Sequence, residues 1–222
     1  MLCPGDKVYT DNDLDLAKEP FRMIISGSSN SGKSYLCAQL IEQYHSKFDR
    51  IVISGGNPES YKSLSNETIN KAIFYEELVD PFSQVTSKGI KVLIVIDDLY
   101  NEAFNNIQIS NCFSRGRHAN LSIILITQNL FPRSSKYHRD ITLNASHMIL
   151  LRQRDLNQVE VLLRQIVGKE SSKKCVQAYR KAVTSTSYGH FFIDLTSTTP
   201  PELQFRSNIF KTDYPYIITY QI

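Results

Sequence analysis

Runs of apolar residues, separated by polar segments, divide the chain into alternating strands and helices. The strongest run, residues 90–98, is apolar on both faces in its core, as expected of a central strand in a parallel sheet. The same reasoning predicts further strands at residues 21–26, 50–54, 121–127 and 147–152. A last pair of apolar segments, residues 191–195 and 203–206, has the pattern of an antiparallel hairpin.

Helices are predicted between these strands. The expected helical segments are residues 35–44, a short helix near 70–78, a stretch that leads to Arg117, and the two segments 156–167 and 171–183. Strands and helices that alternate in this way favour an α/β fold, with a mostly parallel sheet, helices on both faces and a C-terminal antiparallel hairpin. Residues 1–20 hold prolines and an acidic run, so we expect an extended N-terminal lead-in followed by a single domain over residues 21–222.

Composition supports an ordinary folded protein. The chain has 222 residues, of which 41% are hydrophobic and 21% charged, enough for one α/β domain with a sizeable core. A net charge of +3 permits a local contact with nucleic acid but does not argue for one. The four cysteines have no paired spacing, and neither a signal peptide nor a membrane-spanning run is visible, so we expect an intracellular protein with no membrane contact.

The segment between the first strand and the first helix reads Gly-x-x-x-x-Gly-Lys-Ser, in the context that makes this pattern a nucleotide-binding P-loop. Its glycines allow consecutive backbone N–H groups to point at phosphate oxygens. The helix N-terminus adds a partial positive charge, the lysine a full one, and the serine hydroxyl can bind Mg²⁺. The predicted loop consists of Gly27, Ser28, Ser29, Asn30, Ser31, Gly32, Lys33 and Ser34.

Two adjacent acids, Asp97 and Asp98, end the most apolar strand. Ligands of open α/β sheets bind beyond the carboxyl ends of the strands, which is where these acids are expected. We predict that Asp97 holds Mg²⁺ and that Asp98 orients or polarises the attacking water. The alternative, two acids that begin a solvated loop, is less favoured because the P-loop precedes them.

Two further motifs are candidates for the same chemistry. Gln128 follows the strand at 121–127, and it would lie beside the γ-phosphate if that strand separates the P-loop strand from the Asp97 strand. A polar strand cap is the alternative. Arg115 and Arg117 flank a glycine, which suits either a charged loop or an arginine finger that acts on a neighbouring subunit's nucleotide.

Taken in order, these motifs and the segment 114–131 resemble the FtsK–HerA superfamily of DNA-pumping ATPases. More narrowly, they are similar to the genome-packaging ATPases of vaccinia A32 type and of Polinton/Maverick elements. The resemblance extends over about residues 20–210, including segments 141–158 and 191–195. It implies a RecA-like P-loop fold of the ASCE class that uses ATP and Mg²⁺. It also implies that Lys33 and Ser34 hold phosphate and metal, Asp97 binds Mg²⁺, Asp98 activates water and Gln128 senses the γ-phosphate. The second acid is often Glu in the superfamily, so the shorter Asp98 is a departure.

The same resemblance implies a function: ATP hydrolysis in a homo-oligomeric ring that drives double-stranded DNA into a preformed capsid. The partners would be DNA, further copies of the chain and a capsid or portal protein, at the viral assembly site in the host cell. Candidate DNA contacts are Arg133, Lys136 and Arg139, which could equally form a solvated basic loop. Two alternatives stay open: a small-molecule P-loop kinase, and a nucleotide-gated assembly scaffold with vestigial hydrolysis.

Overall fold

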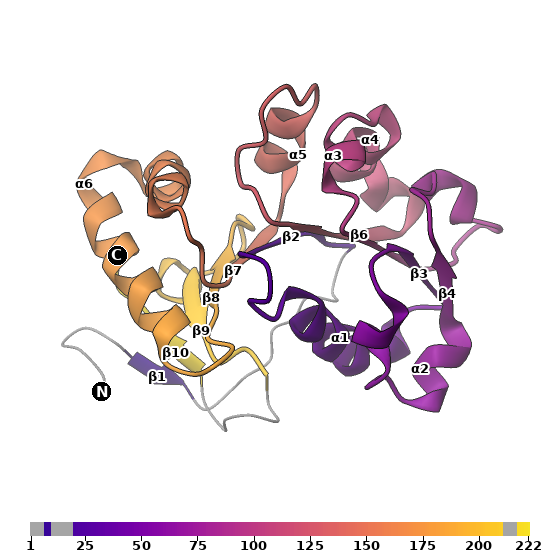
Figure 1. Ribbon diagram of the computed structural model, residues 1–222, viewed down its shortest axis with the longest axis horizontal. Coiled ribbons are helices and arrows are strands. Elements are labelled where there is room, and N and C mark those ends of the chain that lie inside the picture. Colours follow the sequence, from indigo (N-terminus) through magenta and orange to yellow (C-terminus); the bar gives the residue numbers. More distant parts are fainter. Residues whose placement is uncertain (1–6, 10–19, 211–216) are drawn as a thin grey trace.

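In the computed structural model, the strands of the chain form one ten-stranded sheet (Figure 1). The structure describes residues 7–9, 20–210 and 217–222. The strand order across it is β1-β10-β9-β8-β7-β2-β6-β5-β3-β4. The strands are β1 (Lys7–Tyr9), β2 (Arg22–Ser26), β3 (Arg50–Gly55), β4 (Ala72–Tyr75), β5 (Val92–Asp97), β6 (Leu121–Thr127), β7 (His147–Leu150), β8 (Phe191–Asp194), β9 (Phe205–Ser207) and β10 (Ile217–Thr219).

The six strands from β7 to β4 in this order are parallel. β6 lies between β2 and β5, with Ile123 opposite Arg22 on one side and opposite Ile94 on the other. This arrangement places the ends of β2, β5 and β6 at one edge of the sheet. The predicted α/β class with a mostly parallel sheet is therefore confirmed.

The remaining strands are antiparallel. β8 pairs with β7 and β9 pairs with β8, where Ile193 lies opposite Phe205, so the predicted C-terminal hairpin is confirmed. β10 and β1 extend the sheet beyond it and were not predicted. β1 falls within the expected lead-in of residues 1–20, most of which lies outside the described residues.

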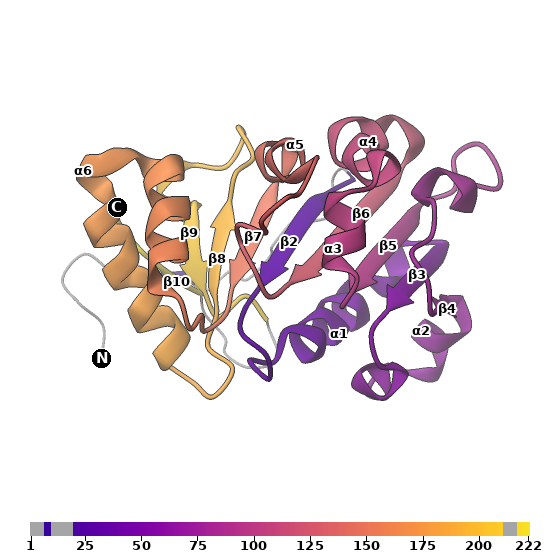
Figure 2. The ribbon, with the colours of Figure 1, turned by 45° about the horizontal axis from the view of Figure 1, so that its top comes forward.

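Helices cover both faces of the sheet. α1 and α2 lie on one face and α3, α4 and α5 on the other, while α6 lies beside β8 and β9 (Figures 1 and 2). In the described part of the chain, no helix is both long and apolar enough to cross a bilayer. The helices are α1 (Lys33–Tyr44), α2 (Asn66–Lys71), α3 (Tyr100–Phe104), α4 (Ile107–Arg115), α5 (His138–Asn144) and α6 (Leu156–Thr184).

Two hydrophobic clusters, one on each face, explain why the central strands are apolar throughout. Met23 and Ile25 of β2 pack with Leu36 of α1. Ile24, between them in the sequence, points to the other cluster, which contains Phe104 and Leu162. Because successive strand side chains point to opposite faces, a strand covered on both sides must be apolar at every position.

α6 contains a break at Gly168, whose φ is +79° and ψ 172°. Glycine adopts this left-handed conformation at little cost because it has no Cβ. The break is a kink that separates two helical segments, which agree with the helices predicted at 156–167 and 171–183. The two predicted helices are therefore present and join at Gly168.

The helix predicted near residues 70–78 is wrong. α2 begins after Ser65, whose Oγ accepts a hydrogen bond from Thr68 N at 3.3 Å, and it ends at Lys71. Residues 72–75 form β4, which pairs in parallel with β3 at the edge of the sheet. Ile73, Phe74 and Tyr75 are β-branched or aromatic residues, which favour a strand over a helix.

Candidate nucleotide-binding site

The loop that joins β2 to α1 is pinned to the two neighbouring strands. Gly27 N donates a hydrogen bond to Thr127 O at 3.2 Å, and Ser28 N donates one to Arg152 O at 3.0 Å. A Cβ built on Gly27 would lie 2.9 Å from Leu151 Cβ, so a larger residue would push the loop away from β7. The loop therefore sits at the carboxyl edge of the parallel strands, where open α/β sheets bind ligands.

The start of α1 is shaped by a residue in the left-handed region. Gly32 is the N-cap with φ +92°, and Asn30 before it has φ +59°. Left-handed residues in a tight loop turn successive N–H groups to the same side, which forms a concavity for anions. The free N–H groups and the dipole at the helix N-terminus add to this attraction for phosphate.

Lys33 is a charged residue that is largely buried, with 7% of its surface exposed. Its Nζ donates a hydrogen bond to Ser28 O at 2.9 Å. Burial lowers the pKa of this ammonium, and the nearby carboxylates of Asp97 and Asp98 partly oppose that shift. A polyanion bound in the loop would give this poorly hydrated cation a direct partner.

Asp97, the last residue of β5, is 1% exposed. Its Oδ2 accepts hydrogen bonds from Ser34 Oγ at 2.7 Å and from Tyr61 OH at 2.8 Å. Burial raises the pKa of this carboxyl, while the two hydrogen bonds and Lys33 act in the opposite direction. Asp97 Oδ1 is buried and has no hydrogen-bond partner in the described part of the chain.

These contacts fit a magnesium ion. The hydroxyl of Ser34 and the carboxylate of Asp97 supply hard oxygen ligands side by side, and Oδ1 of Asp97 is the atom that lacks a partner. Over the residues that the structure describes, no group of three or more His, Cys, Asp and Glu residues forms a metal cage. Mg²⁺ needs no such cage, because it is usually held by one or two protein oxygens together with phosphates and water.

One cavity of about 620 Å³ unites the predicted motifs. Asp98, which has φ +57°, and Gln128, which follows β6, both line it. The structure thus brings the P-loop, the second acid and the glutamine together, and their catalytic roles stay predictions. The other lining residues are Ser29, Asn30, Gly32, Lys33, Ser34, Tyr35, Glu59, Ser60, Lys62, Ser63 and Tyr188.

Arg115 and Arg117 lie away from this cavity. Arg115 ends α4, and Arg117 belongs to the 3-10 helix Gly116–Ala119 that leads into β6. β6 has seven residues, so it spans roughly 23 Å at about 3.3 Å per residue. The two arginines therefore lie at the amino edge of the sheet and the P-loop at the carboxyl edge, so a finger role requires a neighbouring subunit.

Three residues near the P-loop were not singled out from the sequence. Tyr61 binds Asp97 from the 3-10 helix Pro58–Tyr61. Arg152 and Arg154, which follow β7, line a cavity of about 420 Å³ together with residues 28–31. The sequence signal for the two arginines was their position at and just after the end of the strand predicted at 147–152. The sheet topology places that strand beside β2, which leads into the P-loop.

Comparison with known proteins identifies the fold. A family model described as Poxvirus A32 protein matches residues 9–187. The genome packaging NTPase B204 from Sulfolobus turreted icosahedral virus 2, solved in complex with ATP-gammaS, matches with a TM-score of 0.59 and 22% identity, over 85% of this chain and 96% of that chain. B204 from Sulfolobus turreted icosahedral virus, described as a DNA-packaging ATPase, matches with a TM-score of 0.55 and 18% identity, over 82% and 96%. The predicted P-loop NTPase fold is confirmed.

A shorter match is to phosphoglycerate kinase. The enzyme from Campylobacter curvus is 24% identical over 101 residues, which make up 44% of this chain and 24% of the kinase. The enzyme from Clostridium tetani is 25% identical over 100 residues. The chain thus spans about a quarter of the length of the curated relatives that it matches.

Proposed function

The chain belongs to the family described as Poxvirus A32 protein, and on this basis we propose that it is an ATP-hydrolysing motor that packages double-stranded viral DNA. The observation that carries the proposal is one cavity lined by P-loop residues, Asp98 and Gln128, in which Ser34 also donates a hydrogen bond to Asp97. The fold likeness to B204, a packaging NTPase solved with ATP-gammaS, supports ATP as the nucleotide.

Hydrolysis would use this chain's residues in distinct roles. Backbone N–H groups of the P-loop and the ammonium of Lys33 bind the phosphates. Ser34 and Asp97 would hold Mg²⁺, which when bound would neutralise charge that develops on the phosphates. Asp98 orients the attacking water and accepts its proton as the water oxygen bonds to the γ-phosphorus and the bond to the bridging oxygen breaks. Gln128 donates a hydrogen bond to the water or to the γ-phosphate.

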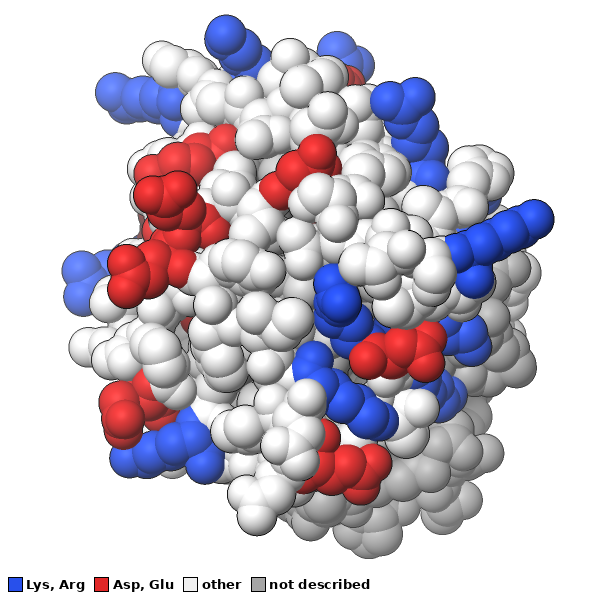
Figure 3. All heavy atoms as spheres, turned by 90° about the vertical axis from the view of Figure 1, so that its right-hand side faces the viewer, with Lys and Arg blue, Asp and Glu red and all other residues white. Residues whose placement is uncertain are grey.

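The segment after Gln128 offers a route from hydrolysis to DNA. It is tied down by Leu130 N, which donates to Gln158 Oε1 at 3.1 Å, and it carries three exposed cations, Arg133, Lys136 and Arg139. Phosphate contacts by such residues are independent of DNA sequence and sensitive to salt. On the side that carries β4 and α2, acidic and basic side chains are mixed, with several acidic ones close together at the upper left of the view, which suits a DNA backbone poorly (Figure 3).

The proposed working form is a homo-oligomeric ring. Because Arg115 and Arg117 lie at the sheet edge opposite the P-loop, either could reach a nucleotide only in another subunit. A finger supplied in this way would couple hydrolysis in one subunit to the position of the next. The ring would act with a capsid or portal protein at the viral assembly site.

The proposal is tested by ATP hydrolysis with and without long double-stranded DNA, from about 50 to 200 mM salt. We expect strong stimulation by DNA that fades as salt rises. Hydrolysis that is indifferent to DNA at every salt concentration contradicts the DNA-driven motor and leaves an assembly scaffold. The match to phosphoglycerate kinase favours a second candidate, a kinase. A kinase would transfer the γ-phosphoryl group to a small-molecule acceptor, and DNA would not affect the rate.

A further inference from the structure

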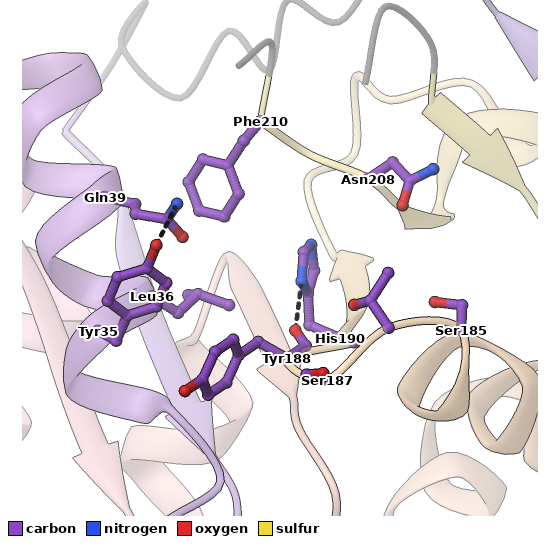
Figure 4. A pocket seen from close by; sticks show the side chains of 11 residues that line it. Tyr35, Leu36, Gln39, Ser185, Ser187, Tyr188, His190, Asn208 and Phe210 are labelled. Atoms are coloured by element: carbon purple, nitrogen blue, oxygen red, sulfur yellow. Dashed lines mark hydrogen bonds between the residues drawn. The ribbon is translucent and has the colours of Figure 1, made fainter. Parts of the chain in front are cut away.

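A third cavity, of about 540 Å³, opens beside the P-loop (Figure 4). The first turns of α1 form one wall, the segment after α6 forms another, and the chain after β9 closes the third. Its volume falls within the range of about 300–1,000 Å³ that is typical of small-molecule sites. The side chains that matter for the argument are Tyr35, Gln39, Tyr188, His190, Asn208 and Phe210.

An aromatic pair joins this cavity to the phosphate cavity. Tyr35 and Tyr188 line both, and their ring centroids lie 5.3 Å apart with the planes tilted by 38°. Tyr188 lies against the P-loop itself, because a Cβ built on Gly32 would lie 2.5 Å from its ring. Tyr35 is 45% and Tyr188 53% exposed, so both rings offer uncovered surface directly beside the start of α1.

The cavity also holds amide groups and further ring surface. Gln39 and Asn208 flank it from opposite sides, and Gln39 Nε2 donates a hydrogen bond to Tyr35 OH at 3.4 Å (Figure 4). The ring of His190 meets the ring of Phe210 edge to face, at 5.8 Å and 70°. Each side-chain amide both donates and accepts, which is the combination that pairs with the N6 and N7 edge of adenine.

We propose that this cavity holds the adenine base and ribose of the nucleotide whose phosphates occupy the P-loop. Tyr35 and Tyr188 would form the aromatic wall, and Gln39 and Asn208 would read the edge of the base. Tyr35 is two residues beyond Lys33, so a base on its ring is directly continuous with phosphates at the helix N-terminus. The assignment rests on the proposed function, since it names the base-binding part of the same nucleotide site.

The test compares ATP with inorganic tripolyphosphate, which has the phosphates but neither base nor ribose. Dissociation constants for both are measured by isothermal titration calorimetry with Mg²⁺ on the full chain. Tyr188→Ala should weaken ATP binding at least about fivefold, the lower end of base–aromatic stacking, and leave tripolyphosphate binding unchanged. Tyr188→Phe, which keeps the ring, should bind ATP like the unaltered protein.

Two controls separate this assignment from the P-loop assignment. Lys33→Ala should weaken both ligands, and a normal tripolyphosphate affinity in that variant would place the failure in the P-loop. Tyr75→Ala removes a tyrosine that is 39% exposed on edge strand β4 and lines neither cavity, so it should change neither affinity. Tyr35→Ala, on the surface of α1, repeats the Tyr188 test with alanine, the best helix former.

The outcomes decide the proposal. Equal weakening of ATP and tripolyphosphate by Tyr188→Ala would make Tyr188 a support of the P-loop, and unchanged affinity for both would remove the base from this cavity. Gln39→Leu adds a test of base identity and should reduce the preference for ATP over CTP. A preference for GTP in the unaltered protein would overturn the assignment to adenine.

Discussion

Asp97→Asn should stabilise the nucleotide-free protein while abolishing hydrolysis. Asp97 is buried with Asp98 as its neighbour, and burial holds its pKa above the ordinary value. At neutral pH the fold therefore carries a buried charge whose Oδ1 has no hydrogen-bond partner among the described residues. In the asparagine variant, the remaining oxygen can accept from Ser34 and Tyr61 as Oδ2 does now, and the amide nitrogen takes the place of the atom without a partner.

The magnitude follows from the removal of one buried charge whose hydrogen bonds are kept. The asparagine would keep both acceptor contacts without the desolvation penalty that burial places on the carboxylate, and we expect a gain of about 1–2 kcal/mol in the free energy of unfolding. For a chain of 222 residues this corresponds to a rise in Tm of about 2–8 °C. With Mg²⁺ and ATP present, the unaltered protein should become the more stable of the two, because a ligand that binds only its folded state raises its free energy of unfolding.

The gain should depend on pH in a defined direction. Because the pKa of Asp97 is higher in the folded chain, the folded state binds more protons between the ordinary and the raised pKa. The unaltered protein therefore loses stability as the pH rises through that window. The asparagine variant lacks this titration. Its advantage should be smallest below the ordinary Asp pKa of about 3.9 and complete above the raised value.

The assay is urea unfolding without nucleotide or metal, with the variant and the unaltered protein compared from acidic to neutral pH. Asp98→Asn is the matched control, because Asp98 is exposed, and its stability should change by less than about 0.5 kcal/mol. If Asp97→Asn is less stable than the unaltered protein at neutral pH, burial does not penalise this carboxylate and the reasoning is refuted.

Five further variants test the other roles. Lys33→Ala should abolish hydrolysis and weaken ATP binding, and turnover at the unaltered rate would remove the P-loop assignment. Asp98→Asn should bind ATP normally but trap it unhydrolysed, whereas loss of binding would make Asp98 a metal ligand. Arg115→Ala or Arg117→Ala should lower turnover about 10³-fold if either is a finger, and mixing with Lys33→Ala should partly restore it; no rescue at any ratio counts against action in trans. Tyr61→Phe should cost about 1–3 kcal/mol of stability, measured by urea unfolding, because a buried carboxylate loses a donor; an unchanged midpoint would mean that the bond contributes nothing.

The central strands of the sheet could be predicted because burial on both faces requires apolar side chains along the strand. β5 and β6 are buried at every position, so each appears as a largely apolar run that ends in a polar motif. Gln128 could be placed near the P-loop on the condition that β6 lies between β2 and β5, and the strand order meets that condition. The motifs and the parallel topology together accounted for the phosphate end of the site.

The edges of the sheet and the base-binding end of the site could not be predicted in this way. β4 has only four residues, most of them exposed, and β1 and β10 have three residues each, so all three strands are shorter than β2, β5 and β6. Tyr188 lies more than 150 residues from Gly32 in the sequence, and only the fold brings its ring against the P-loop. Such contacts depend on where the fold places the segment between α6 and β8, and no local sequence pattern predicts that position.

The central claim is that ATP hydrolysis moves this protein along double-stranded DNA. Displacement of a fluorescent triplex-forming strand from a long duplex tests it most directly, with Lys33→Ala as the control that cannot use ATP. The account predicts displacement that requires hydrolysable ATP, is absent in Lys33→Ala and is delayed as the triplex is placed farther along the duplex. Hydrolysis stimulated by DNA without any displacement of the strand would contradict it.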